Sequence, residues 1–248
     1  MNGRHVGLAL AGGVATVLFP VAALAQSVTV DLGGEGGSTA RIVQLVLLMT
    51  VLSLAPAILV TVTSFTRIIV VLSFLRNALG IQQTPPNVVM ISLALFLTGF
   101  VMAPTLQASY HDGLEPLMAE KINETEAAER AMAPLHAFMM QHVRAQDLQL
   151  FADMAKIDKI TDAKETPLRV LVPSFMISEL RRAFEIGFLL FLPFLIIDMV
   201  VASILMSMGM MMLPPITISL PFKIIFFVLV DGWYLVAGSL VQSFGPGG

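Results

Sequence analysis

Apolar and polar positions follow one another in long blocks along this chain. Four predominantly apolar stretches occur, at residues 42–66, 88–106, 186–205 and 216–241. The first of them, residues 42–66, contains no charged residue. About 20 apolar residues are enough for a helix to cross the hydrocarbon core of a bilayer. The pattern therefore predicts four helical membrane spans, two on each side of a polar middle.

Helix-breaking residues lie within or beside these apolar stretches. They are Pro56, Pro104, Pro193, Pro214, Pro215 and Pro221, together with Asp231-Gly232 in the middle of the last stretch. A proline removes a backbone donor, and in lipid the carbonyl group that it frees must be covered by protein or by a water-filled cavity. We therefore expect broken, proline-interrupted helices arranged as hairpins that pack on neighbouring subunits more than on lipid.

The polar middle, residues 107–185, has the period of amphipathic helices. Pro134 suits the first turn of a helix, and one apolar face follows from it at Leu135, Phe138, Met139 and His142. A second helix, with the same spacing at Phe151, Met154 and Ala155, is expected after a connection near residues 144–147. Since no segment is rich in strand signals, the sequence predicts an all-α fold. Phe138 and Phe151 lie on the two apolar faces, where we expect them to contact another copy of the chain.

The first 25 residues have the pattern of a secretory signal peptide. Arg4 precedes an apolar run, and Ala23-Leu24-Ala25 supplies the small residues of a cleavage site. We expect cleavage after Ala25, followed by a flexible lead at residues 26–41; a retained first membrane helix is the alternative.

The amino terminus would then lie outside the cytoplasm, and this fixes the order of the later segments. Residues 42–106 form a first apolar block, and Arg67 and Arg76 place its internal connection on the cytoplasmic side. Residues 107–185 form an extracytoplasmic polar segment. Residues 186–248 form a second apolar block with a methionine-rich loop.

Composition agrees with a membrane protein and excludes several other classes. Hydrophobic residues make up 56% and charged residues 12% of the 248 residues, with a net charge of −3, and the mean hydropathy is +0.86. A disordered chain or a nucleic-acid-binding protein would need far more charge. Cysteine is absent from the sequence, which removes disulfides and thiolate sites. The sequence contains no phosphate-loop, zincin or hydrolase-elbow motif, so we expect neither catalysis nor a cofactor or metal.

Three segments carry more specific sequence than composition requires. They are TSFTR at residues 63–67 with LRNALG and QQTPPN up to residue 87; PSF at 173–175 with ISELRRAFEIGF at 177–188 and GMMMLPP at 209–215; and ISLPFK at 218–223 with DGW at 231–233. Together these segments resemble the FliP family, membrane components of the flagellar type III export gate. The resemblance covers nearly the whole chain after residue 25, in the family's order.

The resemblance implies a structural role in protein secretion. It implies an all-helical subunit, a ring of five copies, and a channel core formed with the FliQ and FliR proteins. That core would sit in the flagellar basal body of the bacterial inner membrane, receive unfolded flagellar proteins from the FlhA and FlhB side, and form the base on which the rod is built.

Six methionines occur between residues 199 and 212, and the last three, Met210, Met211 and Met212, lie between a glycine and two prolines. A turn is expected there. Methionine side chains are unbranched and can repack around varied shapes, and the resemblance implies that such loops close the channel. We therefore interpret these three residues as a gate; a core or lipid-facing helix is the alternative.

Two groups of charges border or enter the second apolar block. Asp198, Lys223 and Asp231 lie in apolar surroundings and need partners, so we expect structural pairing of Lys223 with one of the carboxylates; a proton path is the alternative. Glu179, Arg181, Arg182 and Glu185 form either a solvated face or a contact between subunits, and Glu179 is our candidate for that contact.

Two other classes of function compete with an export-gate subunit. A proton- or ion-coupled transporter or a motor stator would use Asp198 or Asp231 as its coupling carboxylate. Transporters often have paired halves of similar hydropathy, however, and the two apolar blocks differ in length and pattern. The other competitor is an assembly scaffold that conducts nothing.

Overall fold

The computed structural model describes residues 38–81, 83–157, 166–210 and 212–245. The expected signal peptide and most of the expected lead lie outside the described residues, as does Met211. The chain divides into two units, residues 1–49 and 50–248. Helix α1, Ser38–Val62, begins in the first unit and ends in the second, and all later helices belong to the second unit.

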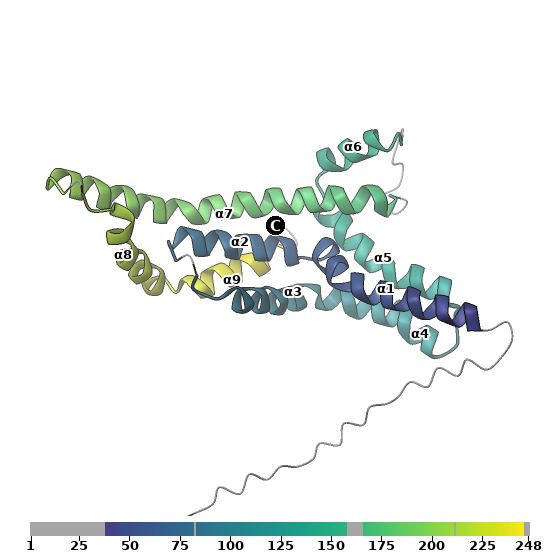
Figure 1. The fold of residues 1–248 in the computed structure, drawn as a ribbon. Helices are drawn as coiled ribbons and strands as arrows, with labels where there is room; N and C mark the ends of the chain where they lie inside the picture. Colours follow the sequence, from purple (N-terminus) through teal and green to yellow (C-terminus); the bar gives the residue numbers. More distant parts are fainter. Residues whose placement is uncertain (1–37, 82, 158–165, 211, 246–248) are drawn as a thin grey trace, which may run out of the picture. The chain divides into compact units, whose positions relative to one another are not determined.

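The described residues are helices joined by short connections, and no strand occurs among them (Figure 1). After α1 come α2 (Phe65–Ala78), α3 (Asn87–Ser109), a π-helical turn (Tyr110–Leu114), α4 (Glu115–Met118), α5 (Glu124–His142), α6 (Ala145–Met154), α7 (Leu168–Ser207), α8 (Pro215–Leu229) and α9 (Gly232–Gln242). The predicted all-α fold is confirmed.

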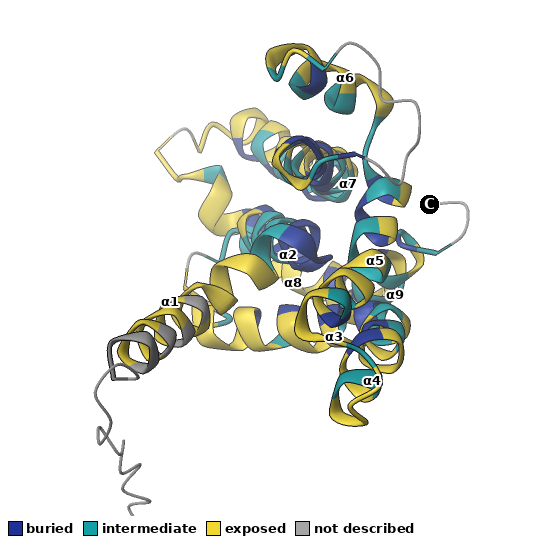
Figure 2. Cartoon of the chain, turned by 90° about the vertical axis from the view of Figure 1, so that its right-hand side faces the viewer, coloured by how far each residue is buried: buried dark blue, intermediate teal, exposed yellow. Residues whose placement is uncertain are grey.

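Within the second unit, the 40-residue helix α7 is the element against which α2, α5, α6 and α8 pack (Figure 1). Helix α2 lies along α7, α3 packs on α2, and α5 packs on both α3 and α7. Helix α6 lies against α7, and α8 folds back beside the end of α7 (Figure 1). The buried residues of α2 and α7 face each other in the end-on view of Figure 2.

Helix α2 has a clear apolar face that accounts for its place in the core. Ile68, Val71, Leu72 and Leu75 recur at helical spacing, and each is at most 1% exposed. Arg67 and Arg76 interrupt the apolar pattern, so we predicted a connection there and no core helix. The structure differs because Arg67 is compensated by a carboxylate from α7, described below, and can therefore be buried.

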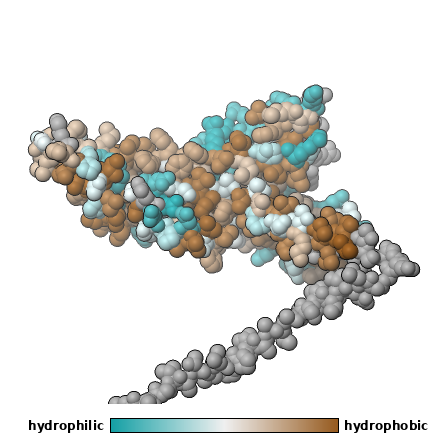
Figure 3. All heavy atoms as spheres, in the orientation of Figure 1, coloured by the Kyte–Doolittle hydropathy of each residue, from teal (hydrophilic) through white to brown (hydrophobic). Residues whose placement is uncertain are grey.

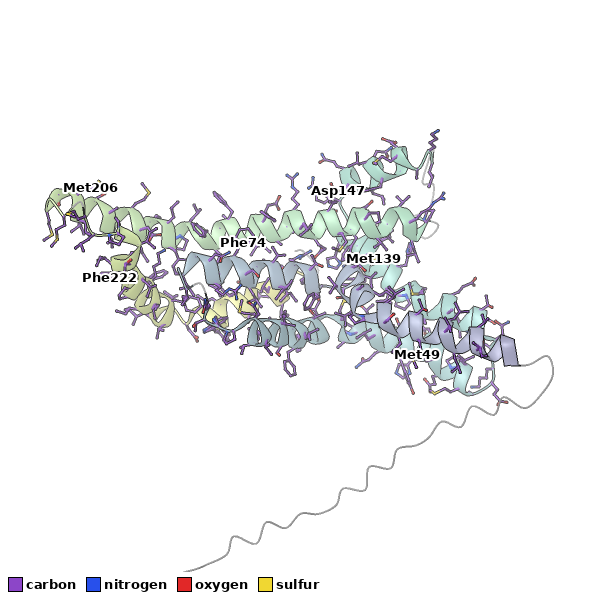
Figure 4. All side chains as sticks on the ribbon, viewed as in Figure 1. Met49, Phe74, Met139, Asp147, Met206 and Phe222 are labelled. Atoms are coloured by element: carbon purple, nitrogen blue, oxygen red, sulfur yellow. The ribbon has the colours of Figure 1, made fainter. Side chains whose placement is uncertain are left out.

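A glycine of α7 allows α2 to approach it closely. A Cβ atom at Gly187 would lie 2.6 Å from the ring of Phe74, which is labelled between the two helices in Figure 4. The same ring makes an edge-on contact with Phe184, with ring centroids 5.0 Å apart. The missing side chain at residue 187 thus makes room for an aromatic contact between α2 and α7.

Three described helices are long and apolar enough to span a membrane: Leu45–Val62, Asn87–Met118 and Leu168–Ser207. Helices α8 and α9 together would make a fourth span, bent by 64°. The bend falls at Asp231, which has a left-handed backbone conformation. Helices continue through Pro56, Pro104, Pro193 and Pro221, and the break expected within the last apolar stretch falls at Asp231.

The polar middle also differs from the prediction at one boundary. Helix α5 begins at Glu124, where the Asn123 side chain accepts a hydrogen bond from the backbone N–H of Glu126 at 2.8 Å. Pro134 lies inside α5, so the prediction that a helix begins there is wrong. Helix α6 follows after two residues, close to the predicted connection.

Candidate functional site

The turn between α7 and α8, residues 208–214, is closed by backbone hydrogen bonds. The N–H of Gly209 donates to the carbonyl of Met206 at 3.1 Å, and the N–H of Met210 donates to Leu205 at 3.0 Å. Gly209 has a φ of +74°. This pair of bonds, with a left-handed glycine, is the Schellman motif that ends many helices. We call residues 208–214 the methionine turn.

The described methionines of this turn are exposed. Met210 is 46% exposed and Met212 is 98% exposed. Met208 and the neighbouring Met206, labelled at the end of α7 in Figure 4, are also exposed. The methionine turn therefore presents several flexible thioether side chains at the tip of a helical hairpin.

Beneath the turn, α7 and α8 enclose an apolar groove of about 700 Å³. Aliphatic, methionine and phenylalanine side chains line it, among them Val200, Leu205, Met210 and Phe222. Figure 3 shows apolar side chains spread over these two helices. The groove is lined only by apolar residues, so it offers packing surface rather than chemistry.

Asp198, Ser219 and Lys223 form a polar cluster where α8 packs on α7, and we call it the Lys223 cluster. The Nζ of Lys223 donates to Asp198 Oδ2 at 2.6 Å and to the carbonyl of Ala78, the last residue of α2, at 3.1 Å. Ser219 Oγ donates to the other carboxylate oxygen at 2.5 Å. Lys223 is 3% exposed. Asp231 is exposed and joins no ion pair among the residues described.

A second polar cluster, the Arg67 cluster, consists of Arg67, Glu179, Ser243 and Phe244. Arg67 donates through Nε to Glu179 Oε2 at 2.9 Å and through Nη2 to Glu179 Oε1 at 2.5 Å, and neither side chain is exposed. Its Nη1 donates to the Ser243 carbonyl at 2.8 Å. The guanidinium carbon lies 3.8 Å from the centre of the Phe244 ring, a cation–π contact.

The electrostatics of Arg67 follow from its burial. Desolvation lowers the pKa of the Arg67 guanidinium from its ordinary value, and the hydrogen bond with Glu179 acts in the opposite direction. An arginine keeps its charge in proteins, so the buried cation requires its carboxylate partner. The cluster therefore joins the first turn of α2, the first third of α7 and the residues that follow α9.

The two predicted aromatic contacts differ in burial. Phe138 is 8% exposed and packs within its own chain, with ring centroids 6.0 Å from Phe175 and 6.2 Å from Phe244. Phe151, on α6, is half-buried. Arg181 and Glu185 form an exposed pair one helical turn apart on α7. Glu179, on the same helix, faces inward instead.

The sequence analysis named Glu179 but missed its partner. Arg67 and Glu179 are 112 residues apart, and no local pattern links them. The available signal was an arginine directly after an uncharged apolar stretch, since such a residue needs a carboxylate if it is buried. Ser243 and Phe244 gave no signal, because a backbone carbonyl and an aromatic ring have no charge to be matched.

No group of three or more His, Asp or Glu residues in the described part of the chain is placed to hold a metal ion. The charged side chains that are buried serve instead to connect helices. These features define a class, an all-α membrane protein with several apolar helices, buried ion pairs and an exposed apolar turn.

The chain belongs to the FliP family, whose sequence model matches residues 48–240. Flagellar biosynthetic protein FliP of Caulobacter vibrioides is 62% identical over 238 residues, which cover 95% of this chain and 90% of that relative. The Bacillus subtilis protein of the same name is 59% identical, covering 82% of this chain and 91% of the relative. That of Aquifex aeolicus is 51% identical, covering 85% and 89%.

Family membership defines the broad function of the chain. It is a structural, membrane-embedded component of the flagellar type III export apparatus, with a role in flagellar biosynthesis. This assignment favours an export-gate subunit over a transporter or motor stator. The transporter and stator interpretations of Asp198 therefore lose their main support.

Proposed function

We propose that five copies of this chain form a ring that, together with FliQ and FliR, makes the channel core of the export gate. The core accepts unfolded flagellar proteins from the FlhA and FlhB side and forms the base of the rod. It lies in the basal body at the bacterial inner membrane, with residues 107–185 on the extracytoplasmic side.

The observation that supports this proposal best is how little of the apolar helix surface is covered within one chain. In the most apolar 18-residue windows of Asn87–Met118 and Leu168–Ser207, only 22% and 17% of the residues are buried. Large side chains such as Phe96 and Phe100 on α3 and Phe188 on α7 are more than 60% exposed. Helices with such surfaces require lipid or other subunits around them, and a ring supplies subunits.

The methionine turn is the candidate gate in this assembly. Met210 and Met212 lie exposed at the end of a hairpin, and Met211 belongs to the same turn by sequence. If each copy directs its turn toward the channel axis, the soft side chains of all copies form one constriction. An apolar constriction excludes ions by dewetting, and flexible thioethers can move aside for a polypeptide.

The remaining candidate residues have structural roles in the proposal. Phe151, which is half-buried, contacts a neighbouring copy with the part of its ring that is exposed, whereas Phe138 supports the same region from inside its own chain. Glu179 supports assembly, by a route argued in the next section. The hydrogen bonds of Asp198 with Ser219 and Lys223 favour structural pairing over a proton path, because both carboxylate oxygens are engaged.

Electron microscopy of the full-length protein, purified with FliQ and FliR from membranes, tests the proposal. We expect a closed assembly with five copies of this chain around a central lumen, and the methionine turns at the narrowest point. A closed assembly without a lumen would instead support a non-conducting scaffold. A stable assembly with a different copy number, or with the turns on its outer surface, would contradict the proposal.

A further inference from the structure

The Glu179 side chain does not reach the surface of its own chain. Both of its carboxylate oxygens accept hydrogen bonds from Arg67, and the side chain is fully buried. A two-point guanidinium–carboxylate pair of this kind fixes both distance and orientation. A second copy of the chain could reach Glu179 only after α2 and α7 had separated.

Arg67 is held equally firmly on its other side. Its Nη1 donates to the carbonyl and the Oγ of Ser243, at 2.8 Å and 3.1 Å. Phe244 lies under the guanidinium plane and also packs on Phe138. One side chain thus connects the start of α2, the first third of α7 and the residues that follow α9.

From this arrangement we infer that Glu179 supports assembly through Arg67 of its own chain and makes no direct contact with a neighbouring copy. The pair is a positioning device that holds α2 and the end of α9 against α7. The surface of α7 that neighbours can meet lies elsewhere on the helix, where Phe184 and Phe188 are exposed. The expected effect on ring yield rests on the proposed function. The contact between Arg67 and Glu179 within one chain does not.

A double-mutant cycle separates the two routes. Removing one partner of a buried ion pair leaves the other charge unpaired, whereas replacing both with apolar residues of similar volume leaves no unpaired charge. We expect Arg67→Met and Glu179→Met to lower ring yield and protease resistance in membranes by about tenfold or more each. The Arg67→Met/Glu179→Met double variant should recover both quantities well above the single Glu179→Met variant.

The exposed pair on the same helix provides a matched control. Arg181 and Glu185 are 58% and 59% exposed and form an ion pair of the same chemical type. Exposed pairs contribute little to stability, so Arg181→Met, Glu185→Met and their combination should change protease resistance less than about twofold. Should the buried single variants give no measurable protein, Arg67→Lys and Glu179→Gln complete the cycle with smaller changes.

Protease resistance and ring yield together test this inference separately from the proposed ring. If the losses in the double variant equal the product of the single losses, Arg67 and Glu179 act independently and the inference is wrong. Single variants with normal protease resistance but no rings would assign Glu179 to a neighbouring copy, which also overturns it. If the unaltered protein forms no ring, the proposed function fails, and the cycle in protease resistance still tests the intrachain pair.

Discussion

At the scale of single residues, Arg67 and Lys223 share one arrangement at two places along α7. Each pairs with a carboxylate of α7, and each also donates to a backbone carbonyl at the carboxyl end of another helix. Cations are favourable at that end of a helix, where carbonyl groups lack intrahelical partners. Glu179 and Asp198 are 19 residues apart, or about 28 Å along a helix. The two ion pairs therefore connect α7 with α2, α8 and α9 at well-separated points.

The first prediction concerns Asp198. Asp198→Asn leaves the Lys223 ammonium buried without a counter-charge, and losing one partner of a buried pair costs about 3–5 kcal/mol. Because the Asp198 side chain is 24% exposed, we expect about 3 kcal/mol, the lower end of that range. Thermal unfolding of the purified protein measures this loss of stability. The amount of protein in membranes provides a second measurement.

Ser219→Ala is the matched control for Asp198→Asn. It removes one hydrogen bond from the same carboxylate and leaves the charge pair, so the expected loss is about 1 kcal/mol. An Asp198→Asn variant that assembles at the normal level but no longer exports protein would instead assign Asp198 to a proton path.

At the scale of helices, the sequence predicted the apolar runs well and the buried polar contacts poorly. The runs at residues 42–66 and 88–106 match α1 and α3 within a few residues. This agreement is expected, because apolar stretches of about this length cross a bilayer as helices. Helix α7 begins 18 residues before the apolar stretch at 186, because its first half is amphipathic and packs on α2 and α6. Partners distant in sequence determined those contacts, and a local pattern cannot reveal them.

The second prediction concerns the contact between α2 and α7. Gly187→Ala places a methyl group 2.6 Å from the Phe74 ring, and overpacking of this kind costs about 1–3 kcal/mol. The smaller side chain of Phe74→Leu should relieve part of that loss when it is combined with Gly187→Ala. Thermal unfolding of the purified single and double variants measures both effects.

Gly99→Ala supplies the comparison for this change. A Cβ atom at Gly99 would have no neighbour within 4 Å, and alanine is the better helix former. We expect Gly99→Ala to be neutral or slightly stabilising. Equal unfolding temperatures for the two alanine variants would show that α2 and α7 are not closely packed at Gly187.

At the scale of the whole molecule, the described residues enclose two ion pairs between helices and leave large apolar surface outside. Its ion pairs hold α2, α8 and α9 to α7, while α3 and the second half of α7 expose large apolar side chains. A soluble protein would have the opposite distribution. A subunit of this kind can be rigid by itself and still require lipid or further subunits for stability. Met210 and Met212 of the methionine turn are exposed and take part in neither of these ion pairs.

The third prediction tests the methionine turn as a gate. Replacing Met210, Met211 and Met212 with Ala removes the thioether bulk from every copy in the ring at once. The turn is closed by backbone bonds at Gly209, so the substitutions should leave folding and assembly largely intact. The widened constriction should admit water, and the closed complex should therefore leak ions or small solutes. Conductance or solute uptake, measured beside the yield of assembled complex, reports the two effects separately.

A control triple variant removes equally exposed methionines from elsewhere in the chain. Met49, Met118 and Met199 are 66%, 64% and 63% exposed and lie outside the turn. Their replacement with Ala should change neither yield nor permeability, because no constriction depends on them. If the turn instead packs against other subunits as part of a core, its triple variant should assemble poorly, and any complex that survives should not leak. An assembled triple variant of the turn with normal impermeability would therefore exclude Met210–Met212 as the gate.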